Sequence, residues 1–93
     1  MKRELLRSAA FMRAAKRLAK RDAAAAEDLR NTFRRLTDDA FHPSLRTHKL
    51  KGRFEGVWAC AAGYDLRILF EFVEKEGIEA ILLLTVGTHD EVY

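Results

Sequence analysis

Two histidines in this sequence lie where they could work as acid and base on a phosphate. His48 stands in a basic stretch, and His89 follows an apolar run and precedes Tyr93. Histidine suits proton transfer because its unperturbed pKa, about 6.5, lies near neutral pH. RNA cleavage without a metal needs a base for the 2'-hydroxyl, an acid for the leaving 5'-oxygen and cations for the developing charge. We therefore predict an RNA-directed site with His48 and His89 as the acid/base pair, and the sequence leaves open which is the base.

Further polar residues could complete this site. Asp65 and Arg67 lie two apart in an expected strand, so their side chains share one face. We predict that Asp65 orients one imidazole, that Arg67 holds the phosphate and that Tyr93 stacks on an unpaired base. The cations expected to bind RNA phosphates are Arg46, Lys49, Lys51 and Arg53.

Each of these residues also has an ordinary structural explanation. Asp65 and Arg67 could form an exposed ion pair, which contributes little free energy. Lysines near a sheet edge are often solvated and discourage the addition of another strand. Tyr93 could be a frayed residue near a chain end. The spacing alone therefore does not decide between a site and a polar surface.

The length and charge of the chain limit its organisation. A chain of 93 residues buries about 60 to 65% of its unfolded surface and holds one core, so we expect a single domain over residues 1–93. The formal charge of +3 and the pI of 9.3 favour polyanions but also suit an ordinary basic protein.

Cysteine usage and hydropathy exclude some classes of protein. Cys60 is the only cysteine, which rules out an intramolecular disulfide and a cysteine-built metal site. With no nucleotide-binding glycine loop or metal-ligand cluster, we predict no cofactor. No apolar run approaches the ~20 residues of a membrane span, and the N-terminus lacks a secretory signal. We expect a cytoplasmic protein without a membrane partner.

Two amphipathic helices are expected in the first 39 residues. Ser8 and Asp22 are N-cap residue types, and apolar residues recur at helical spacing after each, until Asp38 and Asp39 end the pattern. The helices should pack antiparallel. The outer face of the first carries the cations Arg13, Lys16, Arg17, Lys20 and Arg21.

The remainder of the chain predicts strands, because Pro43 interrupts the helical period. We expect strands over residues 45–50, 56–61, 65–72 and 78–86, with a further short strand near residues 4–6. Short turns at residues 62–63 and 74–77 indicate antiparallel hairpins. The apolar run at residues 81–84 predicts a strand covered on both faces. The predicted fold is α+β, with two antiparallel N-terminal helices packed on a small, mainly antiparallel four-stranded sheet.

The combined pattern resembles the RelE/ParE toxin superfamily, and most closely its YafQ-like mRNA-interferase branch. The likeness rests on the two helices, the stretch from His48 to Gly52, the strand from Tyr64 to Ile68 and the ending from Gly87 to Tyr93. It implies a RelE-like fold and a toxin of a type II toxin-antitoxin system that cuts mRNA in the ribosomal A site without a metal. The implied partners are a cognate antitoxin, in a hetero-oligomer that covers the site, and the ribosome with its mRNA.

The resemblance also assigns roles to single residues. His48 and Asp65 match a catalytic histidine and an acidic site residue of YafQ-like toxins, and His89 matches the histidine of their Gly-Thr-His sequence. Tyr93 matches a terminal aromatic residue, and Arg67 matches an arginine of RelE-type toxins.

Two positions depart from the YafQ pattern. Ala61 stands where YafQ has a further histidine, and Thr85 stands where it has an arginine. Arg67 could replace the missing arginine in function. These departures leave open a degenerate toxin that only binds its antitoxin. A second alternative is a ParE-like toxin, which shares the fold but binds DNA gyrase, although His48, His89 and Arg67 argue against it.

Overall fold

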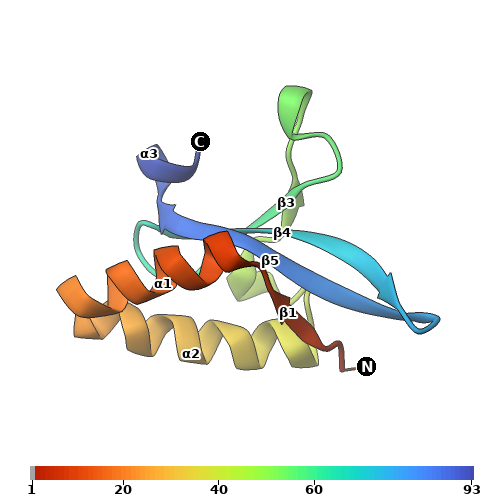
Figure 1. Cartoon of the computed structure of the whole chain (residues 1–93), viewed down its shortest axis with the longest axis horizontal. Helices are drawn as coiled ribbons and strands as arrows, with labels where there is room; N and C mark the ends of the chain where they lie inside the picture. The colour runs from red at the N-terminus through yellow and green to blue at the C-terminus, as the bar shows by residue number, and fades with distance from the viewer. Residues whose placement is uncertain (1) are drawn as a thin grey trace.

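The computed structural model describes residues 2–93, and the side chain of every one of them except Arg53. It has two layers, in which the antiparallel helices α1 (Ala9–Arg21) and α2 (Ala23–Asp38) lie on one face of a five-stranded sheet (Figure 1). This arrangement confirms the predicted α+β fold with two N-terminal helices.

Side-chain caps explain where the two helices begin. Ser8 accepts a hydrogen bond from the Phe11 amide at 3.0 Å, and Asp22 accepts one from the Ala25 amide at 3.2 Å. Each cap satisfies an amide that has no partner within its own helix. Asp22 also ends α1, so a single residue separates the helices. Both predicted caps are confirmed. Among the described residues, no helix has the length and apolar character needed to cross a membrane.

The sheet has the strand order β1-β5-β4-β3-β2. The strands are β1 (Leu5–Arg7), β2 (His48–Lys49), β3 (Trp58–Ala61), β4 (Leu66–Lys75) and β5 (Ile78–Thr88). β1 pairs with β5 in parallel, and the other neighbours are antiparallel. The short strand expected near residues 4–6 is therefore present and adds a fifth strand.

The segment around Pro43 differs from the prediction of a strand over residues 45–50. Pro43–Leu45 form a short 3-10 helix (η1), whose first turn is capped by the His42 side chain. Leu45 is buried, and Arg46 ends the turn with a left-handed φ of 52°. Since this turn uses the first residues of the segment, only His48–Lys49 remain as a strand.

The hairpin between β4 and β5 is tighter than the sequence suggested. Glu76 and Gly77 have φ of 53° and 79°, which is typical of a two-residue type I' turn. β4 therefore continues to Lys75, three residues past its predicted end. Within the hairpin the register shifts between Leu69 and Phe70.

The core lies between the helices and the sheet. Its largest fully buried side chains include Phe11 and Leu36 from the helices and Phe70, Ile81 and Leu83 from the sheet. The prediction that residues 81–84 are covered on both faces was wrong. Leu82 and Leu84 are only half-buried, because no helix pair covers the other face of the sheet.

Cys60 is fully buried in this core, and burial raises the pKa of its thiol to about 12. Because the thiolate is the reactive form, we expect iodoacetamide to modify the folded protein at least about 100-fold more slowly than the unfolded protein. Mass spectrometry of samples quenched over time measures both rates. Equal rates would contradict the burial of Cys60.

Candidate active site

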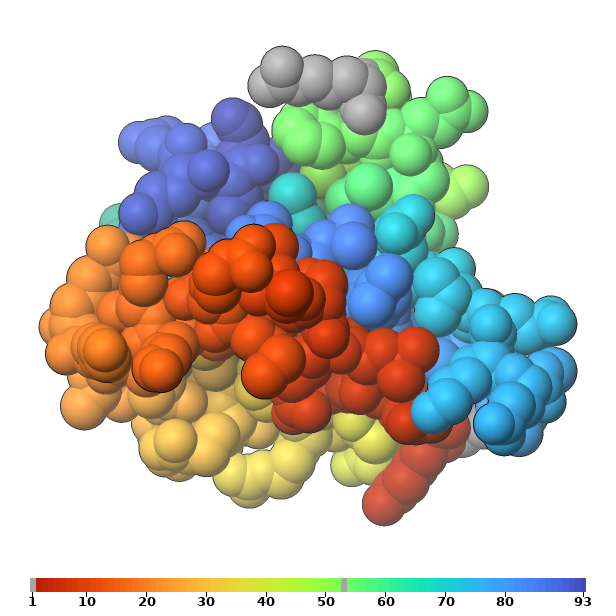
Figure 2. Space-filling model, viewed as in Figure 1, coloured from red at the N-terminus to blue at the C-terminus, as the bar shows by residue number. Residues whose placement is uncertain are grey.

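The two predicted catalytic histidines meet in a cavity at one end of the sheet. The cavity has a volume of about 350 Å³. Its lining consists of Arg46, His48, Ala61, Arg67, His89 and Tyr93. The space-filling view shows the two contributing parts of the chain side by side, the C-terminal segment and the segment around residues 45–60 (Figure 2). The fold thus brings together five of the nine predicted site residues.

Strand register places Arg67 at the centre of this cavity. Arg67 pairs across β4 with Ala61 of β3 on one side and with Gly87 of β5 on the other. Side chains at directly paired positions lie on the same face of a sheet. Arg67 is half-buried, and its guanidinium donates a hydrogen bond to the Leu66 carbonyl at 2.8 Å, which fixes its direction.

The backbone at Arg46 fixes the proton of His48. Nδ1 of His48 lies 2.8 Å from the carbonyl oxygen of Arg46. A carbonyl oxygen only accepts hydrogen bonds, so Nδ1 carries the proton and donates it. In the neutral ring, Nε2 is then left with a free lone pair. The structure therefore presents His48 in the tautomer that a general base requires.

His89 opens the short helix α3 (His89–Val92), which a capping box defines. The Thr88 hydroxyl accepts from the Glu91 amide at 3.3 Å, and the Glu91 carboxylate accepts from the Thr88 amide at 2.8 Å. The hydrogen bond from the Thr88 amide is the main reason why the pKa of Glu91 lies below its usual value. The Arg21 guanidinium, 3.4 Å from Glu91 Oε2, lowers this pKa further. These contacts fix the helix that carries both His89 and Tyr93.

Gly87 allows α3 to fold back onto β5. A Cβ atom at this position would lie 2.9 Å from Glu91 Oε1 and 3.2 Å from Val92 Cγ1. We therefore expect Gly87→Ala to displace α3 and to slow the chemistry of the site by at least about tenfold. Thr85→Ala, on the same strand but outside the cavity, is the matched control and should change little. Equal rates for Gly87→Ala and Thr85→Ala would contradict this role of Gly87.

Contacts with neighbouring residues position His89. Its Nδ1 lies 3.5 Å from Oδ1 of the exposed Asp90, and its backbone amide donates to the Asp65 carbonyl at 3.0 Å. The Tyr93 ring packs edge-on against the imidazole, with 4.6 Å between the ring centroids. The aromatic contact holds the orientation of the imidazole.

Tyr93 contributes a hydroxyl that has no partner within the described part of the chain. The oxygen is buried, and burial raises the pKa of the phenol although Arg67 opposes the shift. The group is therefore a neutral hydrogen-bond donor at neutral pH. Buried polar atoms are normally hydrogen-bonded, so this unpartnered hydroxyl is an exception among the described residues.

Comparison with known proteins identifies the family. The sequence model of the bacterial toxin of type II toxin-antitoxin systems, YafQ, matches residues 3–93. The chain belongs to the YafQ family. It is accordingly a toxin of a type II toxin-antitoxin system, as the resemblance predicted.

Solved structures of related toxins share the YafQ fold. The E. coli DinJ-YafQ complex matches at 17% identity and a TM-score of 0.78, with 99% of both chains covered. A metal-bound toxin from Helicobacter pylori matches at 24% identity and a TM-score of 0.75, with the whole of both chains covered. A YoeB/ParE toxin from Agrobacterium tumefaciens matches at 15% identity and a TM-score of 0.76. The match covers 92% of this chain and 98% of the other. No curated protein sequence is significantly similar.

Asp65 does not line the cavity of this YafQ-family protein. It faces a separate depression between the helix turn and β4, and its contact with His89 runs through its carbonyl oxygen. No ion pair joins Asp65 to Arg67 among the described residues. The predicted orienting role of its carboxylate stays a prediction.

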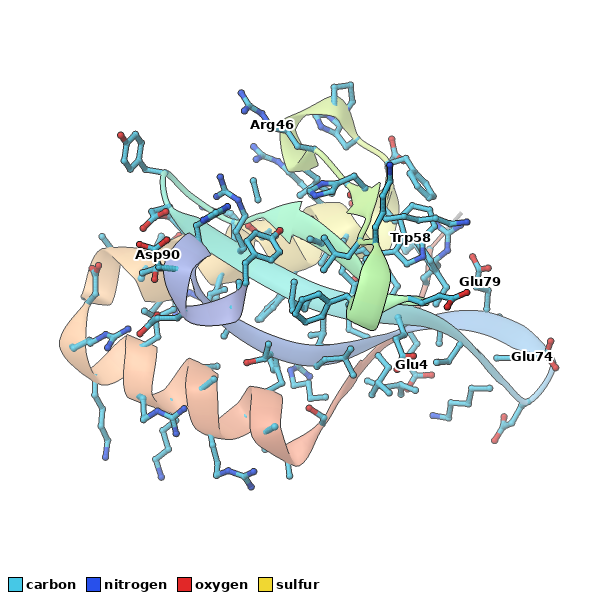
Figure 3. The ribbon with its side chains drawn as sticks, turned by 90° about the horizontal axis from the view of Figure 1, so that it is seen from above. Glu4, Arg46, Trp58, Glu74, Glu79 and Asp90 are labelled. Atoms are coloured by element: carbon cyan, nitrogen blue, oxygen red, sulfur yellow. The ribbon has the colours of Figure 1, made fainter. Side chains whose placement is uncertain are left out.

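The predicted lysines also lie outside the cavity. Lys49 alternates to the other face of β2 from His48, and its Nζ lies 5.5 Å from the centre of the Trp58 ring. Figure 3 shows Trp58 well away from Asp90 and α3. Lys51 is exposed in the following loop, and the side chain of Arg53 lies outside the described residues. Their contacts with RNA phosphates stay predictions.

Of the two positions that depart from the YafQ pattern, only Ala61 lines the cavity. Thr85 lies beside α1 instead, in a small depression with Arg17 and Arg21. Within the described part of the chain, no three histidine, cysteine or acidic side chains gather as metal ligands do.

Proposed function

We propose that this YafQ-family toxin is a ribosome-dependent endoribonuclease that cleaves mRNA by acid/base catalysis without a metal. The observation that carries the proposal is the meeting of His48 and His89 in one cavity with Arg67. The three side chains come from β2, α3 and β4, and a chance polar surface would not bring such a set into one hollow.

His48 acts as the general base in this proposal. Its Nδ1 proton is held by the Arg46 carbonyl, so Nε2 can take the proton of the 2'-hydroxyl. The freed oxygen then attacks the adjacent phosphorus. A new bond from 2'-oxygen to phosphorus forms while the bond from phosphorus to the 5'-oxygen breaks.

His89 acts as the general acid and protonates the leaving 5'-oxygen. The edge-on contact with the Tyr93 ring holds the imidazole in place for the transfer. The products are one RNA end with a 2',3'-cyclic phosphate and another with a 5'-hydroxyl. After the reaction His48 is protonated and His89 is neutral. His48 then releases its proton to solvent and His89 takes one up, which restores both starting forms.

Arg67 supplies the charge stabilisation. One of its guanidinium nitrogens bonds the Leu66 carbonyl, and its remaining N–H groups can bind the phosphate oxygens on which charge develops. Arg46 lines the same hollow and adds a further donor group. Because Ala61 lies directly opposite Arg67, the small side chain leaves room for the guanidinium and the phosphate.

The proposed partners follow the same reasoning. The exposed cations of α1, which include Arg13 and Lys16, suit docking on ribosomal RNA, since phosphate contacts provide most non-specific affinity. A cognate antitoxin would hold the toxin in a cytoplasmic hetero-oligomer and cover the cavity. The solved DinJ-YafQ complex of E. coli supports this expectation.

Expression of the chain in cells tests this function. Wild-type protein and the double variant His48→Ala, His89→Ala are induced briefly, and the 5' ends of cellular mRNA are mapped. Cuts at fixed positions within codons that disappear in the variant support the proposal. Growth arrest with intact mRNA would favour the gyrase-binding alternative, and normal growth with intact mRNA would favour a toxin that only binds its antitoxin.

A further inference from the structure

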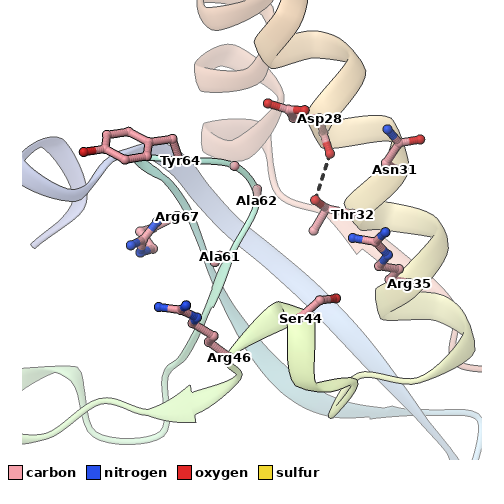
Figure 4. A pocket seen from close by; sticks show the side chains of 11 residues that line it. Asp28, Asn31, Thr32, Arg35, Ser44, Arg46, Ala61, Ala62, Tyr64 and Arg67 are labelled. Carbon is pink, nitrogen blue, oxygen red and sulfur yellow. Dashed lines mark hydrogen bonds between the residues drawn. The ribbon is translucent and has the colours of Figure 1, made fainter.

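A second and larger cavity adjoins the candidate active site. It has a volume of about 630 Å³ and lies between α2 and the turn that joins β3 to β4 (Figure 4). Arg46, Ala61 and Arg67 line both hollows. A chain bound across the reacting groups would therefore continue directly into the second cavity, and we call this cavity the α2 subsite.

The α2 subsite has unpaired positive charge at both ends. Arg46 and Arg67 stand at the end shared with the histidines, and Arg35 reaches in from α2 on the other side of Ala61 (Figure 4). In the described part of the chain, the guanidinium groups of Arg35 and Arg46 make no hydrogen bond or ion pair. Two such groups spaced along one groove suit successive phosphates of a nucleic acid backbone.

The polar wall of the α2 subsite limits where a phosphate can lie. Asp28, Asn31 and Arg35 project from one face of α2, since they are spaced by three and four residues. The Asp28 carboxylate sits against the turn, because a Cβ atom at Gly63 would lie 2.8 Å from its Oδ2. This carboxylate repels phosphate from the turn, so a bound phosphate lies nearer to Arg35 and Arg46.

Tyr64 adds an aromatic surface at the rim of the α2 subsite, with its ring turned away from Asp28 and α2 (Figure 4). Its side chain is fully exposed in the β3 to β4 turn, at the rim of the α2 subsite. A tyrosine ring left fully in water packs against nothing and contributes nothing to the core. Aromatic rings beside cationic grooves commonly stack on unpaired bases.

We propose that the α2 subsite binds the nucleotide next to the scissile phosphate of single-stranded mRNA. Arg35 contacts the phosphate that flanks the scissile one, and Tyr64 stacks on the base. The inference rests on the proposed ribonuclease function, and it adds residues of α2 and of the β3 to β4 turn to the substrate-binding surface.

A chemical double-mutant cycle tests the contact of Arg35. The substrate is a defined mRNA in the A site of stalled ribosomes, and each phosphate flanking the cut is replaced in turn by a neutral methylphosphonate. Arg35→Gln and one of the two methylphosphonates should each raise the half-saturating toxin concentration by about tenfold, with the saturating rate little changed. The two changes together should cost no more than either alone. Arg13→Gln, which removes an equal charge from α1, is the matched control and should remain sensitive to the methylphosphonate.

Tyr64 has its own matched pair of variants. Tyr64→Ala should raise the half-saturating concentration by roughly fivefold to tenfold because the stacking surface is lost, whereas Tyr64→Phe should behave as wild type. Equal behaviour of the two variants would remove Tyr64 from the subsite.

The outcomes separate this inference from the function on which it rests. If wild-type toxin cuts the mRNA but the Arg35 and methylphosphonate effects add in full, the subsite is overturned and the ribonuclease stands. If wild-type toxin cuts nothing, both fail. If Arg35→Gln loosens the complex with the antitoxin and leaves cleavage unchanged, the cavity docks protein and the RNA subsite is overturned.

Discussion

Replacing His48 or His89 by alanine should slow mRNA cleavage at saturating toxin by roughly 10²- to 10⁴-fold, the usual contribution of one general acid or base. Both imidazoles are exposed, so the free energy of unfolding should change by no more than about 0.5 kcal/mol. Single-turnover cleavage of mRNA on stalled ribosomes measures the rate, and urea unfolding measures the stability. Activity near the wild-type level in either variant would contradict the assignment.

A modified leaving group distinguishes the two histidines. If sulfur replaces the bridging 5'-oxygen at the scissile phosphate, the leaving group departs without a proton, so the acid becomes dispensable. We expect this substrate to restore most of the rate of His89→Ala and little of that of His48→Ala. Restoration of His48→Ala instead would reverse the roles.

The third histidine provides a matched control. Nδ1 of His42 accepts a hydrogen bond from the Ser44 amide at 3.1 Å and so caps the turn at Pro43. His42 does not line the cavity that contains the other two histidines. His42→Ala should therefore cleave mRNA at nearly the wild-type rate, with a small loss of stability from the lost cap.

Replacing Arg67 by alanine should lower the saturating rate of cleavage by roughly 10²- to 10³-fold, as expected for loss of a principal donor to the developing charge. Arg67→Lys keeps the charge but loses the planar fork that can bond both the Leu66 carbonyl and a phosphate, so its rate should be intermediate. Single-turnover rates over a range of toxin concentrations separate the saturating rate from the half-saturating concentration.

Arg46 is the matched control for Arg67, because it lines the same cavity but is more exposed. Arg46→Ala should mainly raise the half-saturating concentration, and the His48 tautomer should persist because it depends on the Arg46 backbone. An Arg67→Ala variant that changes only the half-saturating concentration would show that Arg67 binds RNA without stabilising the transition state.

Local chemistry made much of the fold predictable. Ser8 and Asp22 cap helices through contacts three residues away, so the sequence alone locates both starts. Thr88 and Glu91 form a capping box of the same kind, a pattern present in the sequence from which we did not predict α3. Imidazole chemistry suggested His48 and His89 as a pair, and resemblance to a family supported it, but no local pattern joins residues so far apart.

The errors arose where distant packing decides the outcome. Pro43–Leu45 turn because Leu45 reaches the core, so β2 is shorter than the predicted strand over residues 45–50. Arg35 resembled an ordinary solvated helix residue. Only the approach of α2 to the β3 to β4 turn places Arg35 in the same cavity as Arg46, and no spacing along the sequence reveals that approach.

The most direct test of the central claim is cleavage of two mRNAs that differ by one atom. Purified toxin is added to ribosomes stalled with either an all-RNA codon or a codon with 2'-deoxyribose at the nucleotide before the cut. Attack by the 2'-hydroxyl predicts a 2',3'-cyclic phosphate on the RNA product and a loss of at least about 10³-fold with the deoxy substrate. Equal cleavage of both mRNAs would contradict the acid/base mechanism built on His48 and His89.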